Sequence, residues 1–324
     1  MASTTDPIES PIIILGAARS GTTLLAETIL ATHPTIAYWG EPAFVWRYGQ
    51  AYKSSDVRLR QDATASVREY IRKQFGGYLA RHDGLRFMEK TPGNCFRMPF
   101  VLEIFPRAQV VHVLRDGRDV AISAAKEWAG KNPRVRGSSR GHGALGRIWH
   151  LFRTQFDFAA AGDRVRDSRS LMEIPANVGR LMTVIRRQIF GASHLPWGPR
   201  FPGLRQIRHT YSLLQTCALQ WDLSVRHGRS ACSGLSNHQY LELHYEALVR
   251  RPREEVSKIL DFLNVPCDPS LLERMVSGVE NQTLPRWPKG LDKLQVSEIE
   301  GLVSSTLHEL GYEVSQTRGN RVRE

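Results

Sequence analysis

Cysteine is scarce in this sequence, with four residues among 324, and none of them belongs to a recognisable metal-binding pattern. There is no Cys-x-x-Cys pair, and no histidine stands at ligand spacing from a cysteine. This scarcity argues against a zinc site and predicts reduced, mostly buried thiols. The four residues are Cys95, Cys217, Cys232 and Cys267.

Long apolar runs are missing as well. No stretch approaches the run of about 18 apolar residues that a membrane-spanning helix needs. The first residues, MASTTDPIESP, lack the basic segment and apolar core of a secretory leader. We therefore expect neither a signal peptide nor a transmembrane helix, and we expect a cytoplasmic location.

Acidic residues are few relative to basic ones. The chain has 32 Asp and Glu against 44 Lys and Arg, which gives a net charge of +12 and an isoelectric point near 9.9. Such a surface favours anionic partners, whether nucleic acid, an acidic glycan, a membrane surface or a phosphorylated cofactor. Charge alone does not choose among them, and a basic surface also serves solubility.

Short β-branched runs alternate with helical patterns along much of the chain. Residues 11–15, 85–90, 110–114 and 240–245 are typical of strands. Strands that alternate with helices favour a parallel sheet covered on both faces. We predict a three-layer α/β fold similar to the P-loop nucleotide kinases, in a single domain spanning residues 8–312.

Three other segments complete the predicted organisation. Residues 54–79 favour a helix. Residues 130–215, rich in arginine and glycine, break the alternation. We interpret them as a helical insertion or lid, with a separate small domain as the alternative. The polar tail, residues 314–324, is predicted to be disordered.

The first strand runs into a glycine-containing turn, IIILGAARSGTTLL, at residues 12–25. Gly16 and Gly21 allow backbone amides to converge on an anion, and nearby hydroxyl side chains add donors. The lysine of a Walker A loop is absent, because Thr22 stands in its place. A plain strand-to-helix turn would explain the glycines but not the Arg-Ser-Gly-Thr-Thr cluster. The anion-binding candidates are Arg19, Ser20, Gly21, Thr22, Thr23 and Leu24.

A second turn lacks the carboxylate that a magnesium-dependent phosphotransferase needs. The strand at 110–114 ends in Arg115, where such enzymes place a metal-binding acid. A phosphoryl group of ATP usually requires Mg²⁺, whereas a sulfuryl group carries one negative charge and leaves from a phosphate. Fixed cationic side chains and backbone amides are enough to stabilise the transfer of a sulfuryl group. The residues therefore predict a metal-free transfer of a sulfuryl group.

Three motifs in order resemble the sulfotransferases that use 3′-phosphoadenosine 5′-phosphosulfate (PAPS), especially the branch with tyrosylprotein and bacterial sulfotransferases. The motifs are RSGTTLL, VLRDGRDVAISAAKEW and LELHYEALVRRPREEVSKILDFLNVP, and the likeness covers residues 11–128 and 216–290. The resemblance implies that RSGTTLL holds the 5′-phosphosulfate and that Arg115 and Ser123 hold the 3′-phosphate. It also implies that Tyr245 lies near the donor.

The resemblance further assigns the residues of the reaction. Glu41, in a Gly-Glu pair beyond the loop helix, corresponds to the general base, and its aromatic neighbours predict a partly desolvated, more basic carboxylate. Lys90 corresponds to the lysine that stabilises the departing phosphate, with Arg19 as a second cation. Glu89 is interpreted as an ion-pair partner.

The resemblance suggests two further assignments. The segment NQTLPRWPKGL resembles a late loop over the nucleotide, which suggests Arg286 and Lys289 as further contacts. A histidine could replace Glu41 as the base, as in the cytosolic sulfotransferases. The candidates, all within the predicted insertion, are His142, His150, His194 and His209.

Other functions stay open at this point. A P-loop small-molecule kinase and a non-catalytic binder of nucleic acid or another polyanion are the alternatives; the missing Walker lysine and the irregular aromatic spacing count against them. We expect PAPS as donor, 3′-phosphoadenosine 5′-phosphate (PAP) as product, and no metal. The expected acceptor is a hydroxyl of a small molecule, glycan or lipid, because Pro42-Ala43 departs from the tyrosylprotein pattern.

Overall fold

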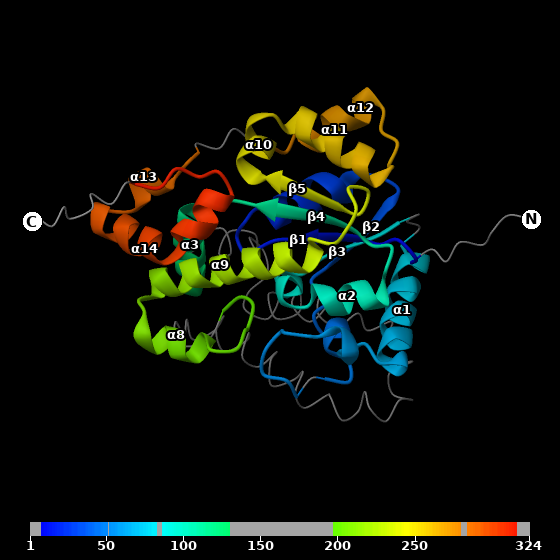
Figure 1. Ribbon diagram of the computed structural model, residues 1–324. Helices are drawn as coiled ribbons and strands as arrows, with labels where there is room; N and C mark the ends of the chain where they lie inside the picture. The colour runs from blue at the N-terminus through cyan, green and yellow to red at the C-terminus, as the bar shows by residue number, and fades with distance from the viewer. Residues whose placement is uncertain (1–7, 51, 83–85, 130–196, 280–283, 316–324) are drawn as a thin grey trace, which may run out of the picture.

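The computed structural model describes residues 8–50, 52–82, 86–129, 197–279 and 284–315 (Figure 1). Its centre is a parallel sheet in the order β2-β3-β1-β4-β5. The strands are β1 (Ile12–Leu15), β2 (Ile36–Gly40), β3 (Arg86–Lys90), β4 (Gln109–Leu114) and β5 (Tyr240–His244). The α/β class and the parallel sheet are those predicted from the sequence.

Side chains of the central strand β1 point alternately into two cores. Ile13 and Leu15 belong to one buried cluster, and Ile12 and Ile14 to the other. Because both faces of a parallel sheet are covered, such a strand is apolar at every position. This explains why the sequence IIIL shows no alternation of polar and apolar residues.

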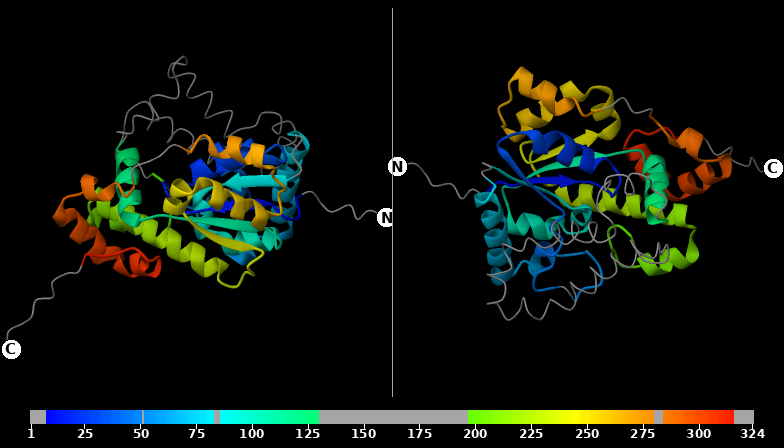
Figure 2. Two further views of the ribbon diagram at one scale, coloured as in Figure 1. Left: turned by 90° about the horizontal axis from the view of Figure 1, so that it is seen from above. Right: turned by 180° about the vertical axis from the view of Figure 1, so that it is seen from behind.

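Helices cover each face of the sheet. On one side lie η1 (Leu24–Ile29), η2 (Leu30–Thr32), α10 (Tyr245–Arg250), α11 (Pro252–Leu263) and α12 (Pro269–Val276). The other side carries η3 (Val45–Arg47), α1 (Ala65–Ala80), η5 (Pro92–Phe96), α2 (Met98–Ile104), α3 (Gly117–Trp128), α8 (Leu204–Thr210), α9 (Leu213–Cys232) and α14 (Lys293–Glu309). Figures 1 and 2 show this three-layer arrangement. The short elements η4 (Arg60–Asp62) and α13 (Trp287–Gly290) complete the described part.

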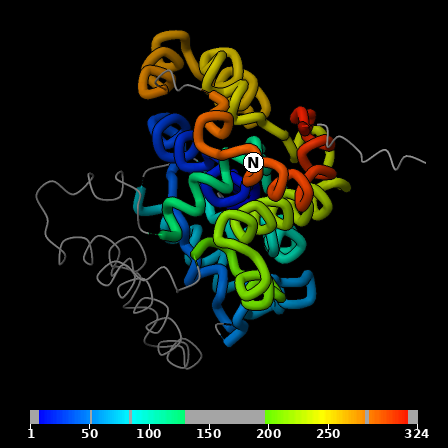
Figure 3. The backbone as a smooth tube through the Cα atoms, turned by 90° about the vertical axis from the view of Figure 1, so that its left-hand side faces the viewer, coloured from blue at the N-terminus to red at the C-terminus, as the bar shows by residue number. Residues whose placement is uncertain are grey.

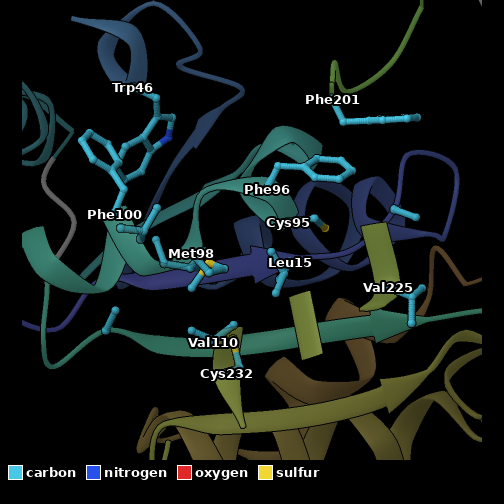
Figure 4. Close-up of a cluster of buried hydrophobic side chains, with 14 of the residues drawn as sticks. Leu15, Trp46, Cys95, Phe96, Met98, Phe100, Val110, Phe201, Val225 and Cys232 are labelled. Carbon is cyan, nitrogen blue, oxygen red and sulfur yellow. The ribbon is translucent and has the colours of Figure 1, made fainter. Parts of the chain in front are cut away.

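The core beneath the sheet is built largely from aromatic side chains. Trp46 is fully buried and makes edge contacts with Phe75, Phe100 and Phe105 at centroid separations of 5.0, 6.4 and 6.3 Å. Figure 4 shows Trp46 beside Phe100 in the same buried cluster as Met98 and Leu15. Such aromatic packing anchors η3 and the loop before it, and this loop follows the predicted base Glu41.

The parallel register brings the carboxyl ends of the strands to one edge, which Figure 3 views directly. Lys90 at the end of β3 is aligned with Ile14 of β1 and with Gly40 of β2. The chain turns from β1 toward β2 and from β4 toward β5, in opposite directions, so the switch point lies between β1 and β4. Ligands of open α/β sheets bind at such a crevice.

One predicted boundary is wrong, and one strand was missed. The helix expected over 54–79 begins only at Ala65, because the preceding loop is held by a buried arginine instead. Arg58 donates to the carbonyls of Gln50, Ser55 and Val57, and these bonds replace helical ones. A strand at Ile36–Gly40, which the sequence analysis did not predict, forms β2.

Residues 197–215, the described end of the predicted insertion, lead into α9. Helix α9 begins at Leu213, where Ser212 and Gln215 form a capping box, and the preceding segment is tied to α9 by Gln220. The Gln220 amide donates to the carbonyls of Trp197 and Pro199. Residues 130–196, with the predicted lid, and the tail from 316 lie outside the described residues.

Three further findings concern the cysteines, metal-ligating clusters and long apolar helices. All four cysteines are free thiols, and three of them are buried, as predicted. Among the described residues, no group of three or more His, Cys, Asp or Glu side chains has the arrangement of a metal site. No helix in the described ranges is both long enough and apolar enough to cross a membrane.

Candidate active site

The turn after β1 places two glycines where a side chain does not fit. A Cβ on Gly16 would lie 2.8 Å from the carbonyl oxygen of Val113, and one on Gly21 would lie 2.1 Å from Cδ2 of Tyr245. Gly21 also has a φ of 99°, which favours glycine. The glycines therefore let the loop lie against β4 and against Tyr245 at the switch point.

Two buried polar atoms in the turns after β1 and β4 have no hydrogen-bond partner among the described residues. Ser20 is 0% exposed, and its Oγ has no hydrogen-bond partner there. Arg115, at the end of β4, is 6% exposed, and its Nε likewise lacks one. Buried polar groups are normally satisfied, so both atoms have hydrogen-bonding capacity that the described residues do not use.

Arg115 is held from three directions. Nη1 donates to the carbonyl oxygen of Arg19 at 3.3 Å, Nη2 donates to Oδ2 of Asp119 at 3.2 Å, and the guanidinium lies 4.3 Å from the centre of the Tyr245 ring. The Tyr245 ring thus contacts both the glycine turn and Arg115. The structure brings together these three predicted donor-site segments.

Arg19 reaches from the turn to helix α3. Its Nε donates to Oγ of Ser123 at 3.1 Å, and Nη1 lies 3.9 Å from Oε2 of Glu127. The predicted pair Arg115 and Ser123 is therefore linked to the loop through Arg19. The remaining loop residues differ in exposure: Thr22 is buried, Leu24 is half-buried and Thr23 is exposed.

Lys90 and Glu41 form an ion pair at the adjoining strand ends. Nζ of Lys90 lies 2.6 Å from Oε1 of Glu41, and the lysine side chain is 4% exposed whereas that of Glu41 is 47% exposed. Lys90 is therefore a buried residue at the end of β3. The side chain of Glu41 is thus half-buried, and its role as the base stays a prediction.

A second carboxylate lies near the same ammonium. Oε1 of Glu27, in η1, lies 3.9 Å from Nζ of Lys90. The same oxygen accepts a hydrogen bond from the hydroxyl of Tyr38 at 3.0 Å. Burial, reinforced by the charge of Glu27, raises the pKa of Tyr38, so the phenol stays protonated and remains a donor. Neither Glu27 nor the donor role of Tyr38 was predicted from the sequence.

Unusual backbone conformations coincide with this site. Among the described residues, three that are not glycine have positive φ: Arg19 at 76°, Glu41 at 52° and Asn264 at 54°. Asn264 caps the end of α11, which is a common use of that conformation. The other two are predicted catalytic residues, and strained backbone of this kind gathers at functional sites.

The late loop reaches the site through its backbone. The amides of Arg286 and Trp287 donate to Oδ1 of Asp119 at 3.0 and 2.7 Å. This places the start of α13 next to the residue that holds Arg115. The side chains of Arg286 and Lys289 are exposed. Asp119 is a site residue that sequence reasoning missed, although it lies within the RDGRDVAIS motif.

Glu89 differs from its prediction as an ion-pair partner. Within the described residues it makes no ion pair, and it accepts hydrogen bonds from Trp46 at 3.3 Å, from Thr91 at 2.8 Å and from Asn94. Burial raises its pKa to about 7, against the lowering by these donors and by Arg97. Glu89 faces the aromatic core on the side opposite Lys90.

The histidines proposed as alternative bases gain no support from position. His209 is an exposed residue of α8. The other three, His142, His150 and His194, lie outside the described residues.

Comparisons with known proteins point to one family. A model described as Sulfotransferase family matches residues 11–174 and 186–269. A curated relative from Aquifex aeolicus (strain VF5), described as an uncharacterized protein, is 25% identical over 307 residues. The match covers 90% of this chain but only 30% of the relative, so this chain spans about a third of that protein's length.

Two solved structures share the fold. The sulfotransferase domain from the curacin biosynthetic pathway superposes with a TM-score of 0.50 at 17% identity, covering 95% of this chain and 99% of that one. The sulfotransferase STF9 from Mycobacterium avium gives a TM-score of 0.50 at 13% identity, covering 95% and 78%. The family match extends over most of the sequence and includes both turns of the site. The chain therefore belongs to the sulfotransferase family.

Proposed function

We propose that this protein transfers a sulfuryl group from PAPS to an acceptor hydroxyl. The observation that carries the proposal is that two buried polar groups, Ser20 Oγ and Arg115 Nε, lack partners among the described residues. They come from the turns after β1 and β4, on either side of the switch point. A nucleotide with an anionic group at each end, bound across these turns, would satisfy both.

The chain's charges suit the two anionic ends of PAPS. The backbone amides and hydroxyls of the turn at 19–24 would hold the 5′-phosphosulfate. Arg115 and Ser123 would hold the 3′-phosphate, with Tyr245 beside them. Arg19 joins the two groups, since it donates to Ser123 and its carbonyl accepts from Arg115. Arg286 and Lys289 of the late loop would add further positive charge.

The reaction needs a proton acceptor and cations at the leaving group. When bound, PAPS supplies a sulfuryl group attached to a phosphate leaving group. Glu41 takes the proton of the acceptor hydroxyl as that oxygen bonds to sulfur. Lys90 and Arg19 hold the charge left on the phosphate as the sulfur–oxygen bond breaks. Lys90 contacts Oε1 of Glu41, which leaves Oε2 to take the proton.

The acceptor class follows from Glu41. Its carboxylate is half exposed, so a hydroxyl can reach it from solvent beyond the ends of β2 and β3. We propose a small-molecule, glycan or lipid hydroxyl. The residues that follow Glu41, Pro42 and Ala43, depart from the tyrosylprotein pattern, which argues against a peptide tyrosine. A screen of such hydroxyl compounds with radiolabelled PAPS identifies the acceptor.

Calorimetry with PAP and with Mg-ATP tests the donor assignment. We expect PAP to bind to the wild-type protein with EDTA present and to bind more tightly than ATP. Binding of ATP that requires Mg²⁺, without binding of PAP, would instead indicate a phosphotransferase. Salt-sensitive binding of DNA or heparin that survives Arg115→Ala, again without PAP binding, would indicate a polyanion binder.

A further inference from the structure

Asp119 is a buried carboxylate that joins three segments of the site. Its side chain is 1% exposed. It accepts Nη2 of Arg115 at 3.2 Å and the backbone amides of Arg286 and Trp287 at 3.0 and 2.7 Å. The two amides lie 167 and 168 positions further along the chain, so only the tertiary structure brings them to this acid.

The contact fixes how Arg115 presents its donors. Nη1 is engaged by the Arg19 carbonyl and Nη2 by Asp119, while Nε has no partner among the described residues. A buried guanidinium that loses its carboxylate partner also loses the interaction that orients it. Asp119 therefore determines the direction in which Nε of Arg115 points.

The late loop has a second, separate anchor. The guanidinium of Arg118 lies 4.0 Å from the centre of the Trp287 ring. Arg118 is in turn fixed by Asp116 at 2.7 Å and by Glu300 at 2.6 Å. Because this stacking does not involve Asp119, removing the Asp119 charge leaves Trp287 attached to α3. The specific effect of Asp119 is thus on Arg115 and on the backbone of residues 286–287.

We propose that Asp119 is a positioning residue that sets the preference for a 3′-phosphate, by holding Arg115 and the late loop against each other. This inference rests on the proposed function. The carboxylate does not contact the nucleotide but acts through Arg115 and through two backbone amides. Its loss weakens binding of a 3′-phosphorylated nucleotide and leaves binding of the same nucleotide without that phosphate unchanged.

Calorimetry with PAP and with adenosine 5′-monophosphate tests the proposal, because the ratio of the two affinities isolates the 3′-phosphate. In Asp119→Asn we expect the preference for PAP to fall by about tenfold, as for loss of a charge-assisted hydrogen bond. Arg115→Ala should remove the preference. Asp222→Asn is the matched control, since Asp222 is a buried carboxylate on α9 that bonds Thr306. It should leave the ratio unchanged.

The outcomes separate this inference from the proposed function. If wild-type protein does not prefer PAP, the proposed donor is wrong. If wild-type protein prefers PAP, Arg115→Ala loses the preference and Asp119→Asn keeps it, the role of Asp119 is refuted.

A measurement on the wild-type protein covers the case in which the variant fails to fold. Hydrogen exchange at the amides of Arg286 and Trp287 should slow more with saturating PAP than with saturating adenosine 5′-monophosphate. Equal slowing by the two nucleotides would overturn the proposal, because it would mean that the 3′-phosphate is not coupled to the loop through Asp119.

Discussion

The ammonium of Lys90 donates to the carboxylate of Glu41 over 2.6 Å, although 49 positions separate the two residues. The register of β2 and β3 explains the pairing, because Gly40 is aligned with Lys90 and Glu41 is the next residue. The amide of Glu41 also donates to the carbonyl of Lys90 at 3.1 Å. Backbone and side chain together hold the proposed base beside the proposed leaving-group cation.

Replacing Glu41 by glutamine should abolish turnover and preserve donor binding. Glutamine keeps an oxygen that accepts from Lys90, but it cannot take a proton from a hydroxyl. We expect the rate to fall by about a hundredfold or more while PAP affinity changes little. Steady-state rates and calorimetry measure the two quantities. The control is Glu254→Gln on the surface of α11, and turnover of Glu41→Gln close to that control would remove Glu41 from the mechanism.

Replacing Lys90 by methionine should reduce turnover more than it reduces PAP affinity. The ammonium is proposed to act on charge that develops as the bond to phosphate breaks, and loss of such a group costs about a hundredfold in rate. The two carboxylates near it, Glu27 and Glu41, are each about half exposed, so solvent limits the cost of leaving them unpaired. An equal loss in rate and in affinity would instead indicate uniform binding of the donor.

Adding a single methyl group at Gly21 should prevent PAP binding. In Gly21→Ala the new Cβ would lie 2.1 Å from the Tyr245 ring, and a φ of 99° disfavours alanine in any case. Thermal unfolding and PAP calorimetry report the damage. Gly76→Ala in α1 is the control, because nothing lies within 4 Å of its added Cβ. That control should stabilise the protein by about 0.5–1 kcal/mol, and normal PAP binding by Gly21→Ala would contradict the proposed loop geometry.

Glu89 should make the protein less stable as pH rises through the weakly acidic range. Its carboxyl ionises near pH 4.5 in the unfolded chain but near pH 7 in the folded protein, chiefly because it is buried. Between these values the folded state binds more protons, so the free energy of unfolding falls with rising pH, by about 3 kcal/mol in total. Below this pH range Glu89 does not lower the free energy of unfolding. Above it, the loss in free energy of unfolding no longer changes with pH.

Glu89→Gln isolates that contribution. Glutamine removes the titration, and rotation of the Asn94 amide offers Oδ1, which lacks a partner among the described residues, to the new N–H. Denaturant unfolding at several pH values should show a flatter profile for Glu89→Gln than for the wild type. Glu103→Gln, which removes a carboxylate paired with Arg60 and Arg68, should keep the wild-type slope. A slope unchanged by Glu89→Gln would mean that other groups cause it.

Prediction from the sequence worked best where the signal is local. A β-branched run before a glycine turn predicts β1 and its loop, and the RDGRDVAIS motif places Arg115 and Ser123 on the neighbouring strand and helix. It failed at β2, because Ile36–Gly40 is short and follows the loop helix with only a few residues between. It also failed at residues 54–64, because the hydrogen bonds of Arg58 depend on a folded loop.

The sequence by itself determined which residues stand at the ends of strands, because strand patterns and turn residues are encoded within a few positions of each other. In that sense it determined the candidates Arg19, Lys90 and Arg115. Only the tertiary structure decided their partners: Glu41 and Glu27 beside Lys90, and Asp119 between Arg115 and the late loop. The reason is that a parallel sheet aligns strand ends from distant parts of the chain, so burial and charge pairing at this edge depend on residues that are remote in sequence.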